Sequence, residues 1–172
     1  MSLRVVRLVP DEILNKKTRP VKKIDERIKQ LLNDMVNTMR ENNGIGLAGP
    51  QVGVLRRLFV IDLGDDKVYK VINPEILEKK GSDIDIEGCL SIPNFQGTVE
   101  RAEWIKAKYT DENGQEQIIE ADGLLAKCFQ HEYDHLDGIL ITSKYIEEVT
   151  DENIEEIREK LAKDKAEDKD EE

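Results

Sequence analysis

Both histidines of the chain lie in one pentapeptide, HEYDH (residues 131–135). On a helix, residues four apart share a face, so His131 and His135 can bind the same metal ion. Glu132 follows the first histidine, and its carboxylate can reach a water held by that ion. This spacing is typical of zinc-type hydrolases, although the same motif also occurs by chance on solvated helix faces.

Cys89 is a candidate for the third ligand, because a catalytic site of this kind needs three protein ligands and an open position for water. It lies in the segment EGCLS (residues 87–91). There Gly88 permits close approach of the backbone, and a bound metal would deprotonate the thiol. Taken alone, a cysteine in a turn of small residues is more often a buried apolar side chain.

A glycine-rich segment, GIGLAGPQ (residues 44–51), supplies a third group of unusual residues. Its glycines predict a loop pressed against something that excludes side chains, although a helix stop followed by a tight turn would look the same. No Lys-Ser or Lys-Thr pair follows it, and the third glycine is misplaced for a dinucleotide-binding fingerprint, which argues against a phosphate loop. Gln51 ends the segment with a neutral hydrogen-bond donor.

The elements that must position these residues follow from hydrophobic spacing. One helix is predicted to begin at an N-cap, Asp25, and to stop at Asn43-Gly44. A second helical pattern over residues 123–136 carries the histidine motif, and a third begins at residue 150 or 151. Strand-like runs cover residues 58–63, 68–72, 104–110 and 115–120, the last two joined by a hairpin signal at Asn113-Gly114.

These patterns predict an α+β fold in which antiparallel or mixed strands surround a central metal-binding helix, with one helix near each end of the chain. A chain of 172 residues is long enough for one packed domain and short for two. We expect a catalytic domain over residues 1–146. Residues 147–172 are expected to add an acidic helix and a disordered tail to the same domain.

The composition limits the class of protein. Apolar residues make up 38% and charged residues 37%, and no stretch approaches the ~20 apolar residues of a membrane helix. The first residues lack the apolar segment of a signal peptide, so we expect a cytoplasmic protein whose two cysteines stay reduced. The net charge of −11 argues against nucleic acid as a ligand, because phosphate binding needs clustered Lys and Arg.

Together, GIGLAGPQ, EGCLS and QHEYDHLDG (residues 130–138) resemble the three signature motifs of the peptide deformylases, in the same order and with similar separations. The resemblance extends over residues 4–146. One position departs from the family pattern, since Gly49 stands where alanine is usual. Gln51 nevertheless stays in register.

The resemblance implies a hydrolase that removes the N-formyl group from the first methionine of nascent polypeptides and releases formate. It implies a divalent metal bound by Cys89, His131 and His135. Ferrous iron is favoured by the resemblance, while zinc, nickel and cobalt suit the same ligand types. A metal-bound water would attack the formyl carbon, with Glu132 as general base and then general acid. The oxyanion would be stabilised by the Gln51 side chain and the Leu90 backbone N–H.

The resemblance also implies how the substrate is held. The methionine side chain would enter an apolar pocket that includes Ile45, Leu125 and Cys128, and the peptide would bind as an added strand. For Leu125 and Cys128, ordinary core packing is an equal alternative. Gly46 and Gly88 would let the backbone crowd the formyl group, so that acetyl is excluded. The expected partners are formyl-methionyl nascent peptides at the ribosome exit, without membrane or nucleic acid.

Two other functions use the same residues. A structural zinc module could be closed by Cys89, Cys128, His131 and His135, which would leave no position for water and no use for Glu132 or Gln51. A metallopeptidase could use the two histidines and a downstream carboxylate such as Glu155. That reading leaves Cys89 and the glycine-rich segment without a role.

Overall fold

The computed structural model describes residues 2–170, which contain three α-helices and eight strands. The helices are α1 (Glu26–Glu41), α2 (Gly123–Leu136) and α3 (Ile154–Asp170). The strands are β1 (Gly46–Ala48), β2 (Leu58–Asp62), β3 (Val68–Lys80), β4 (Asp83–Cys89), β5 (Ile92–Arg101), β6 (Trp104–Thr110), β7 (Glu116–Asp122) and β8 (Glu148–Val149). Short 3-10 helices cover Glu12–Asn15, Gly49–Val52 and Ile141–Ser143.

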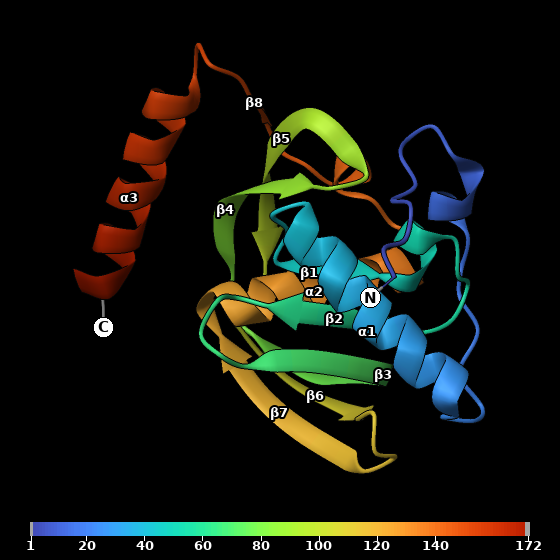
Figure 1. Cartoon of the computed structure of the whole chain (residues 1–172). Helices are drawn as coiled ribbons and strands as arrows, with labels where there is room; N and C mark the ends of the chain where they lie inside the picture. The colour runs from blue at the N-terminus through green and yellow to red at the C-terminus, as the bar shows by residue number, and fades with distance from the viewer. Residues whose placement is uncertain (1, 171–172) are drawn as a thin grey trace.

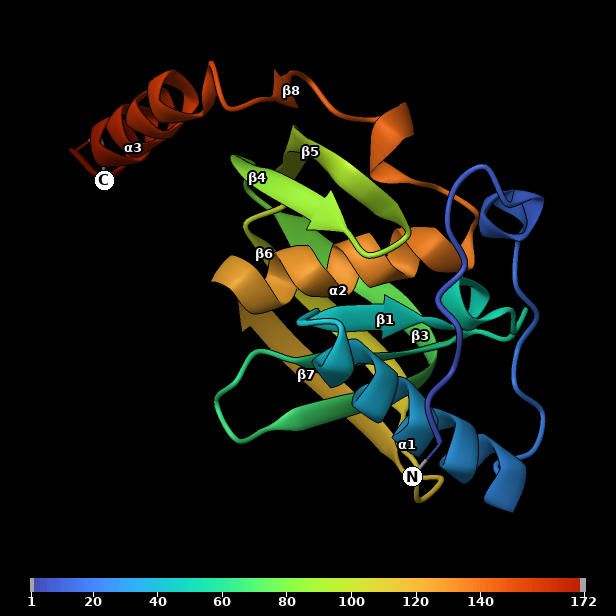
Figure 2. The ribbon, with the colours of Figure 1, turned by 45° about the horizontal axis from the view of Figure 1, so that its top comes forward.

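The strands form two sheets with α2 between them (Figures 1 and 2). One sheet has the order β1-β2-β3-β6-β7 and the other β4-β5-β8, and every neighbouring pair of these strands is antiparallel. Helix α2 contacts β1, β2, β6 and β7 of the larger sheet. The α+β prediction, with strands around one central helix and a helix near each end, is therefore confirmed.

Strand β2 shows how the sequence builds the core. Successive side chains of a strand point to opposite faces of a sheet. Phe59 and Ile61 pack with α2 in one buried cluster, while Leu58 and Val60 pack with α1 in another. The larger sheet is thus covered by α1 on one face and by α2 on the other. Packing against the sheet fixes the position of α2 and of the side chains that it carries.

The boundaries of α1 and α2 agree with the sequence. Asp25 caps α1, its Oδ1 accepting a hydrogen bond of 3.1 Å from the backbone N–H of Ile28. Helix α2 begins at Gly123 and ends at Leu136, the same residues that the periodicity predicts. Both helices carry a continuous apolar face, which is the strongest helical signal a single sequence contains.

The structure differs from the sequence-based prediction at β3. This strand continues through Asn73-Pro74, where the sequence predicts its end, and runs to Lys80 with two register shifts against β6. Asn73 has a φ of 51°. Its side chain accepts from the Val21 N–H and donates to the Val21 carbonyl, both at 2.8 Å, which holds this irregular position. A bulge therefore carries the strand past a proline that would otherwise end it.

The C-terminal segment also differs. Helix α3 begins at Ile154 instead of residue 150 or 151, because the Asn153 Oδ1 accepts from the Thr150 N–H at 2.7 Å and holds a turn there. The helix continues to Asp170, through the segment for which the sequence predicts a disordered tail. Alanine, lysine and glutamate in that segment are good helix formers. The domain boundary at residue 146 stays a prediction. No helix in residues 2–170 has the length and apolar character needed to cross a membrane.

Candidate active site

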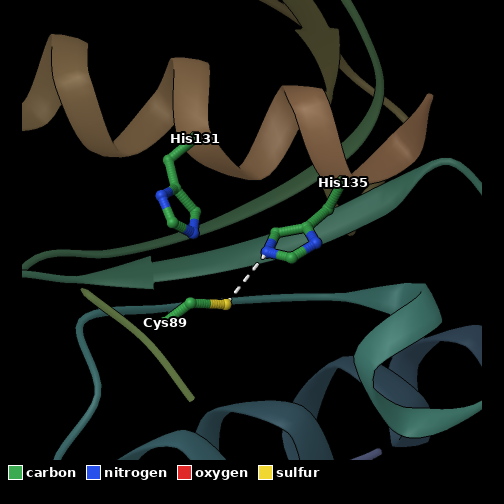
Figure 3. Close-up of side chains that lie close together, drawn as sticks. All are labelled: Cys89, His131 and His135. Atoms are coloured by element: carbon green, nitrogen blue, oxygen red, sulfur yellow. Dashed lines mark hydrogen bonds between the residues drawn. The ribbon is translucent and has the colours of Figure 1, made fainter. Parts of the chain in front are cut away.

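Helix α2 and strand β4 bring the three predicted metal ligands together. His131 and His135 project from the same side of α2 toward Cys89 at the end of β4 (Figure 3). Their potential ligand atoms all lie within 4.8 Å of one another, and Cys89 Sγ is 3.4 Å from His135 Nε2. These segments lie more than 40 residues apart in sequence, so the cluster is a product of the fold.

The cluster fits a divalent transition metal. One thiolate and two imidazoles are the donors that zinc, iron, cobalt and nickel accept, and here the three donor atoms converge on one point. His135 is almost fully buried and its Nδ1 has no hydrogen-bond partner in residues 2–170, which leaves Nε2 to face Cys89. The donor chemistry and the geometry therefore agree.

A buried charge network orients His131. Its Nδ1 lies 2.8 Å from Glu87 Oε1, so that Nδ1–H donates to the carboxylate and Nε2 is left toward the site. Glu87 in turn accepts from Arg101 Nε at 2.6 Å and Nη2 at 2.9 Å. Arg101 Nη1 donates to Asp134 at 2.9 Å. The network therefore ties β4, the end of β5 and α2 together directly behind the first histidine.

The network determines the ionisation of its members. Burial opposes the charge of Glu87, but hydrogen bonds from His131 and Arg101 outweigh it and hold the pKa of Glu87 below its usual value. Burial also acts to lower the pKa of His131, but its hydrogen bonds with Cys89 and Glu87 outweigh this and raise the pKa to about 10. A metal binds neutral imidazole, so metal binding at His131 would release a proton.

Glu132 is placed as a proton acceptor. Its side chain is almost fully buried, with Oε1 4.0 Å from His131 Nε2. In residues 2–170 its Oε2 has no hydrogen-bond partner. Burial raises the pKa of Glu132 to about 7. A carboxylate with such a pKa, beside three potential metal ligands, is suited to take up and give back a proton at neutral pH.

Gln51 is held in one orientation by the 3-10 helix that contains it. Its Oε1 accepts from the Ala48 N–H at 2.9 Å, and its Nε2 donates to Ser91 Oγ at 3.0 Å and lies 3.5 Å from Cys89 Sγ. The amide N–H2 is therefore directed into the site. The packing explains why position 49 is glycine in this chain, because a Cβ there would lie 2.7 Å and 2.8 Å from the carbonyl oxygens of Val54 and Arg56.

The extended segment that contains Arg7 and Val9, here called the N-terminal arm, is hydrogen-bonded to the two turns that carry Gln51 and Cys89. The Arg7 N–H donates to the Gln51 carbonyl at 2.7 Å, and the Val9 N–H donates to the Ser91 carbonyl at 2.9 Å. The arm thus joins the Gln51 turn to the turn that follows Cys89. Both catalytic turns are held by backbone hydrogen bonds that do not depend on side chains.

A cavity of about 370 Å³ opens onto the cluster. Most of the predicted site residues line it: Ile45, Gly46, Gln51, Gly88, Cys89, Leu90, Cys128, His131 and Glu132. Leu125 does not line this cavity; it packs against the core cluster of α2 and the larger sheet, in agreement with its alternative reading as ordinary core. Leu124, one residue earlier, lines the cavity, although the sequence motifs do not indicate it.

The two predicted glycines at the cavity differ in their surroundings. A Cβ at Gly46 would lie 2.7 Å from Glu132 Oε1 and 3.0 Å from Cys128 Sγ, so this position has no room for a side chain. A Cβ at Gly88 would meet nothing closer than 3.7 Å, which is ordinary contact. Gly46 is therefore crowded by the protein itself, whereas Gly88 faces open space of the cavity, and its role beside the formyl group stays a prediction.

The geometry argues against both alternative functions. In residues 2–170, the cysteines and histidines whose ligand atoms converge are Cys89, His131 and His135, without Cys128. The Cys128 thiol instead points toward the Ile45 carbonyl at 3.8 Å, and burial raises its pKa well above the usual value. Glu155 is exposed on α3, outside the cluster. A closed four-ligand module therefore lacks its fourth ligand, Cys128. A peptidase of the second kind lacks its third ligand, Glu155.

Comparisons with known proteins agree with this geometry. Residues 3–163 match the family model of polypeptide deformylase. A peptide deformylase of Caldicellulosiruptor bescii is 52% identical over 158 residues, covering 92% of this chain and 95% of the relative. Peptide deformylase 1 of Clostridium perfringens is 55% identical over 141 residues, covering 81% and 96%.

Solved structures show the same relationship. The crystal structure of peptide deformylase from Thermotoga maritima superposes with a TM-score of 0.82 at 41% identity, covering 85% of this chain and 99% of that one. A Synechococcus elongatus peptide deformylase in complex with actinonin superposes with a TM-score of 0.80 at 41% identity, covering 82% and 79%. Because 161 of the 172 residues of this chain match the family model, the chain belongs to the polypeptide deformylase family.

Proposed function

We propose that the cleft between β1, β4 and α2 removes the N-formyl group from formyl-methionine at the start of nascent polypeptides and releases formate. The observation that carries this proposal is the Glu132 carboxylate, which is buried, has one oxygen without a hydrogen-bond partner in residues 2–170, and lies beside three converging metal ligands. A structural metal site has no use for such a group, whereas a hydrolase needs it.

Cys89, His131 and His135 would hold the divalent metal. When bound, such an ion lowers the pKa of water and polarises a carbonyl group. Of the ions that suit these ligands we propose ferrous iron, on the resemblance to the family motifs, with zinc, nickel and cobalt as ions that the same donors accept. Glu87 and Arg101 keep His131 in the orientation that this binding requires.

The remaining chemistry belongs to the chain's own groups. Glu132 takes the proton of the attacking water and passes it to the nitrogen of the departing amine, so that formate and a free methionyl N-terminus result. Negative charge develops on the formyl oxygen as the tetrahedral intermediate forms. The Gln51 amide, held by Ala48 and Ser91, and the Leu90 backbone N–H donate hydrogen bonds to that oxygen.

The sheet topology supports binding of the peptide as an added strand. β1 is an edge strand of the five-stranded sheet, and β4 is an edge strand of the three-stranded sheet. Gly46 on β1 and Gly88 on β4 both line the cavity, so two unpaired strand edges face it. An extended peptide can hydrogen-bond to either edge through its backbone, while its methionine side chain fills the cavity beside Ile45, Leu124 and Cys128.

The net charge and the composition of the chain indicate where the reaction takes place. The protein carries a net charge of −11, which disfavours attachment to RNA. We place it in the cytoplasm, where it meets formyl-methionyl peptides as they leave the ribosome.

Replacing Gly46 by alanine is expected to lower kcat/KM about 100-fold, because the methyl group would displace Glu132 and a shift of about 1 Å in a catalytic group costs on this order. Formate release from a formyl-Met peptide measures the effect. Thermal unfolding of the variant should stay cooperative, which separates a displaced base from a lost fold. Unchanged turnover would show that the position of Glu132 is not set by Gly46.

The specificity of the reaction tests the proposed function directly. The purified protein, metallated under anaerobic conditions, is offered formyl-Met, acetyl-Met and unmodified Met peptides of otherwise identical sequence, and formate, acetate and peptide fragments are measured. Formate alone is expected, because in this proposal the backbone at Gly46 and Gly88, which both line the cavity, crowds the reacting carbon so that it admits hydrogen and excludes methyl. Cleavage within the unmodified peptide would indicate a peptidase. Absence of any product at full metal occupancy would indicate a structural site.

A further inference from the structure

A group of basic side chains lies along the segment that leads into α1, on the side of the molecule opposite α3 (Figures 1 and 2). Residues 16–23, KKTRPVKK, contain five basic residues, and no acidic residue stands between Glu12 and Asp25. Arg56 adjoins them through an isolated parallel bridge with Arg19. These exposed or half-buried side chains are here called the basic strip: Lys16, Lys17, Arg19, Lys22, Lys23 and Arg56.

Backbone hydrogen bonds fix the position of the basic strip. The Thr18 N–H donates to the Leu136 carbonyl at 2.9 Å, and the Arg19 N–H donates to the Leu55 carbonyl at 3.1 Å. The Arg19 carbonyl in turn accepts from the Arg57 N–H at 2.9 Å. The backbone is therefore ordered before any ligand arrives, and binding costs only the ordering of the side chains.

The cations of the basic strip have no acidic partner. Within residues 2–170, none of the six forms an ion pair, although the chain carries 37 acidic residues against 26 basic ones. Two acids at its border are already engaged, Asp11 with Arg7 and Asp137 with Arg57. Glu12 is exposed and can balance one cation at most. The strip thus keeps a local excess of positive charge.

This local excess opposes folding and is not cancelled by the rest of the chain. Arg19 and Arg56 lie side by side in the bridge, and like charges in that arrangement repel each other. Residues 147–172 carry 13 acidic and 5 basic residues, but α3 lies on the far side of the molecule (Figure 1). Exposed charges more than about 8 Å apart are largely screened at physiological salt. The net charge of −11 therefore does not describe the basic strip.

We propose that the basic strip binds the phosphate backbone of RNA. Residues 16–23 span up to about 25 Å when extended, so their side chains can neutralise several phosphates in a row. Each neutralised phosphate releases counterions, which drives binding. The two arginines can in addition donate paired hydrogen bonds to phosphate oxygens.

Other anionic partners fit the strip less well. Within residues 16–23, Val21 is buried and no large apolar side chain is exposed, whereas binding to a membrane surface uses such side chains. A protein partner would need an apolar interface core, which the strip does not offer. The choice of RNA over DNA rests on the proposed function, because nascent peptides emerge from the ribosome, which is built around RNA.

The test measures binding of a fluorescent RNA hairpin to the purified protein over a range of salt concentrations. A dissociation constant of about 10⁻⁶ M is expected at 0.05 M salt, and the logarithm of the affinity should fall against log salt with a slope of about −4 to −5. The double variant Lys22→Gln with Lys23→Gln should reduce that slope by about 2 and weaken binding about 100-fold at 0.05 M salt. The matched control is Lys160→Gln with Lys163→Gln, which removes the same charge from two exposed lysines of α3 and should leave binding within about twofold.

The outcomes separate RNA binding from catalysis. Formate release from a short formyl-Met peptide should be the same in all three proteins, because the basic strip lies outside the catalytic cavity. No RNA binding at 0.05 M salt, or equal loss of affinity in both double variants, would overturn the role of the strip while formate release still supports the deformylase. Tighter binding to a DNA hairpin of the same sequence, or to vesicles of anionic lipid, would overturn the choice of RNA.

Discussion

Replacing Glu132 by glutamine is expected to lower kcat by a factor of about 10² to 10⁴ while the metal content of the protein stays unchanged, because loss of a general base costs this much. The amide has the shape of the carboxylate but cannot take a proton from water. Glu132 is not one of the three converging ligand residues, so its loss should not release the metal. Formate release and metal analysis of the same preparation measure both quantities.

The surroundings of Glu132 make this experiment clean. Its Oε2 has no hydrogen-bond partner in residues 2–170, so the substitution breaks no strong bond in the folded protein. The glutamine keeps the volume of the side chain but places an N–H2 donor at a buried position, so the free energy of unfolding should change by no more than about 1–3 kcal/mol. A glutamine variant that loses its metal would make Glu132 a ligand, and one that keeps full turnover would assign the proton transfer to another group.

Replacing Arg101 by methionine is expected to lower the free energy of unfolding by about 3–5 kcal/mol, because the change removes the buried cation between two carboxylates and leaves Glu87 with His131 and Asp134 with Lys144 as their remaining partners. Only 5% of Arg101 is exposed to solvent. Urea unfolding measures the loss. The matched control is Arg40→Met, which removes a more exposed ion pair, that of Arg40 with Asp62 at 2.8 Å, and should cost no more than about 1 kcal/mol.

The Arg101 variant should also bind metal more weakly. Glu87 loses the partner that holds it against His131, and such supporting contacts are worth about tenfold to a hundredfold in metal affinity. Titration with a chelator in the absence of urea, where the variant is still folded, would measure the loss of metal affinity. If Arg40→Met and Arg101→Met had equal effects on stability, the buried network would not be the support that its geometry indicates.

The sequence predicts the elements whose side chains repeat with a clear period. The boundaries of α2 and of β6 (Trp104–Thr110) agree with the prediction, because each has one face in the core. β4 and β5 were missed. In β4, Ile84 and Ile86 alternate with Asp83 and Asp85, but no side chain of the strand is fully buried, and its EGC sequence looks like a turn. Whether such a segment forms a strand depends on its pairing with distant segments of the chain. A local sequence pattern carries no information about that pairing.

The candidate site shows the same division. The motifs identify Cys89, His131, His135 and Glu132, because their residue types are rare and their spacing has a chemical meaning. The roles of Arg101 and Asp134 were not predicted, since the arginine reaches across 14 and 33 positions to Glu87 and Asp134, and only the folded chain brings them together. Leu125 packs against the core, which is one of the two roles that the sequence leaves open for it, while its neighbour Leu124, about 100° further round the helix, lines the cavity.

The N-terminal arm gives the molecule an order of assembly. Val9 is made before its partner, the Ser91 carbonyl, which follows about 80 residues later, or roughly 4–16 s of synthesis at 5–20 residues per second. The histidines of α2 follow later still. The segment around Arg7 and Val9 therefore leaves the ribosome before its partners, and its hydrogen bonds to both catalytic turns can form only after those turns have been made.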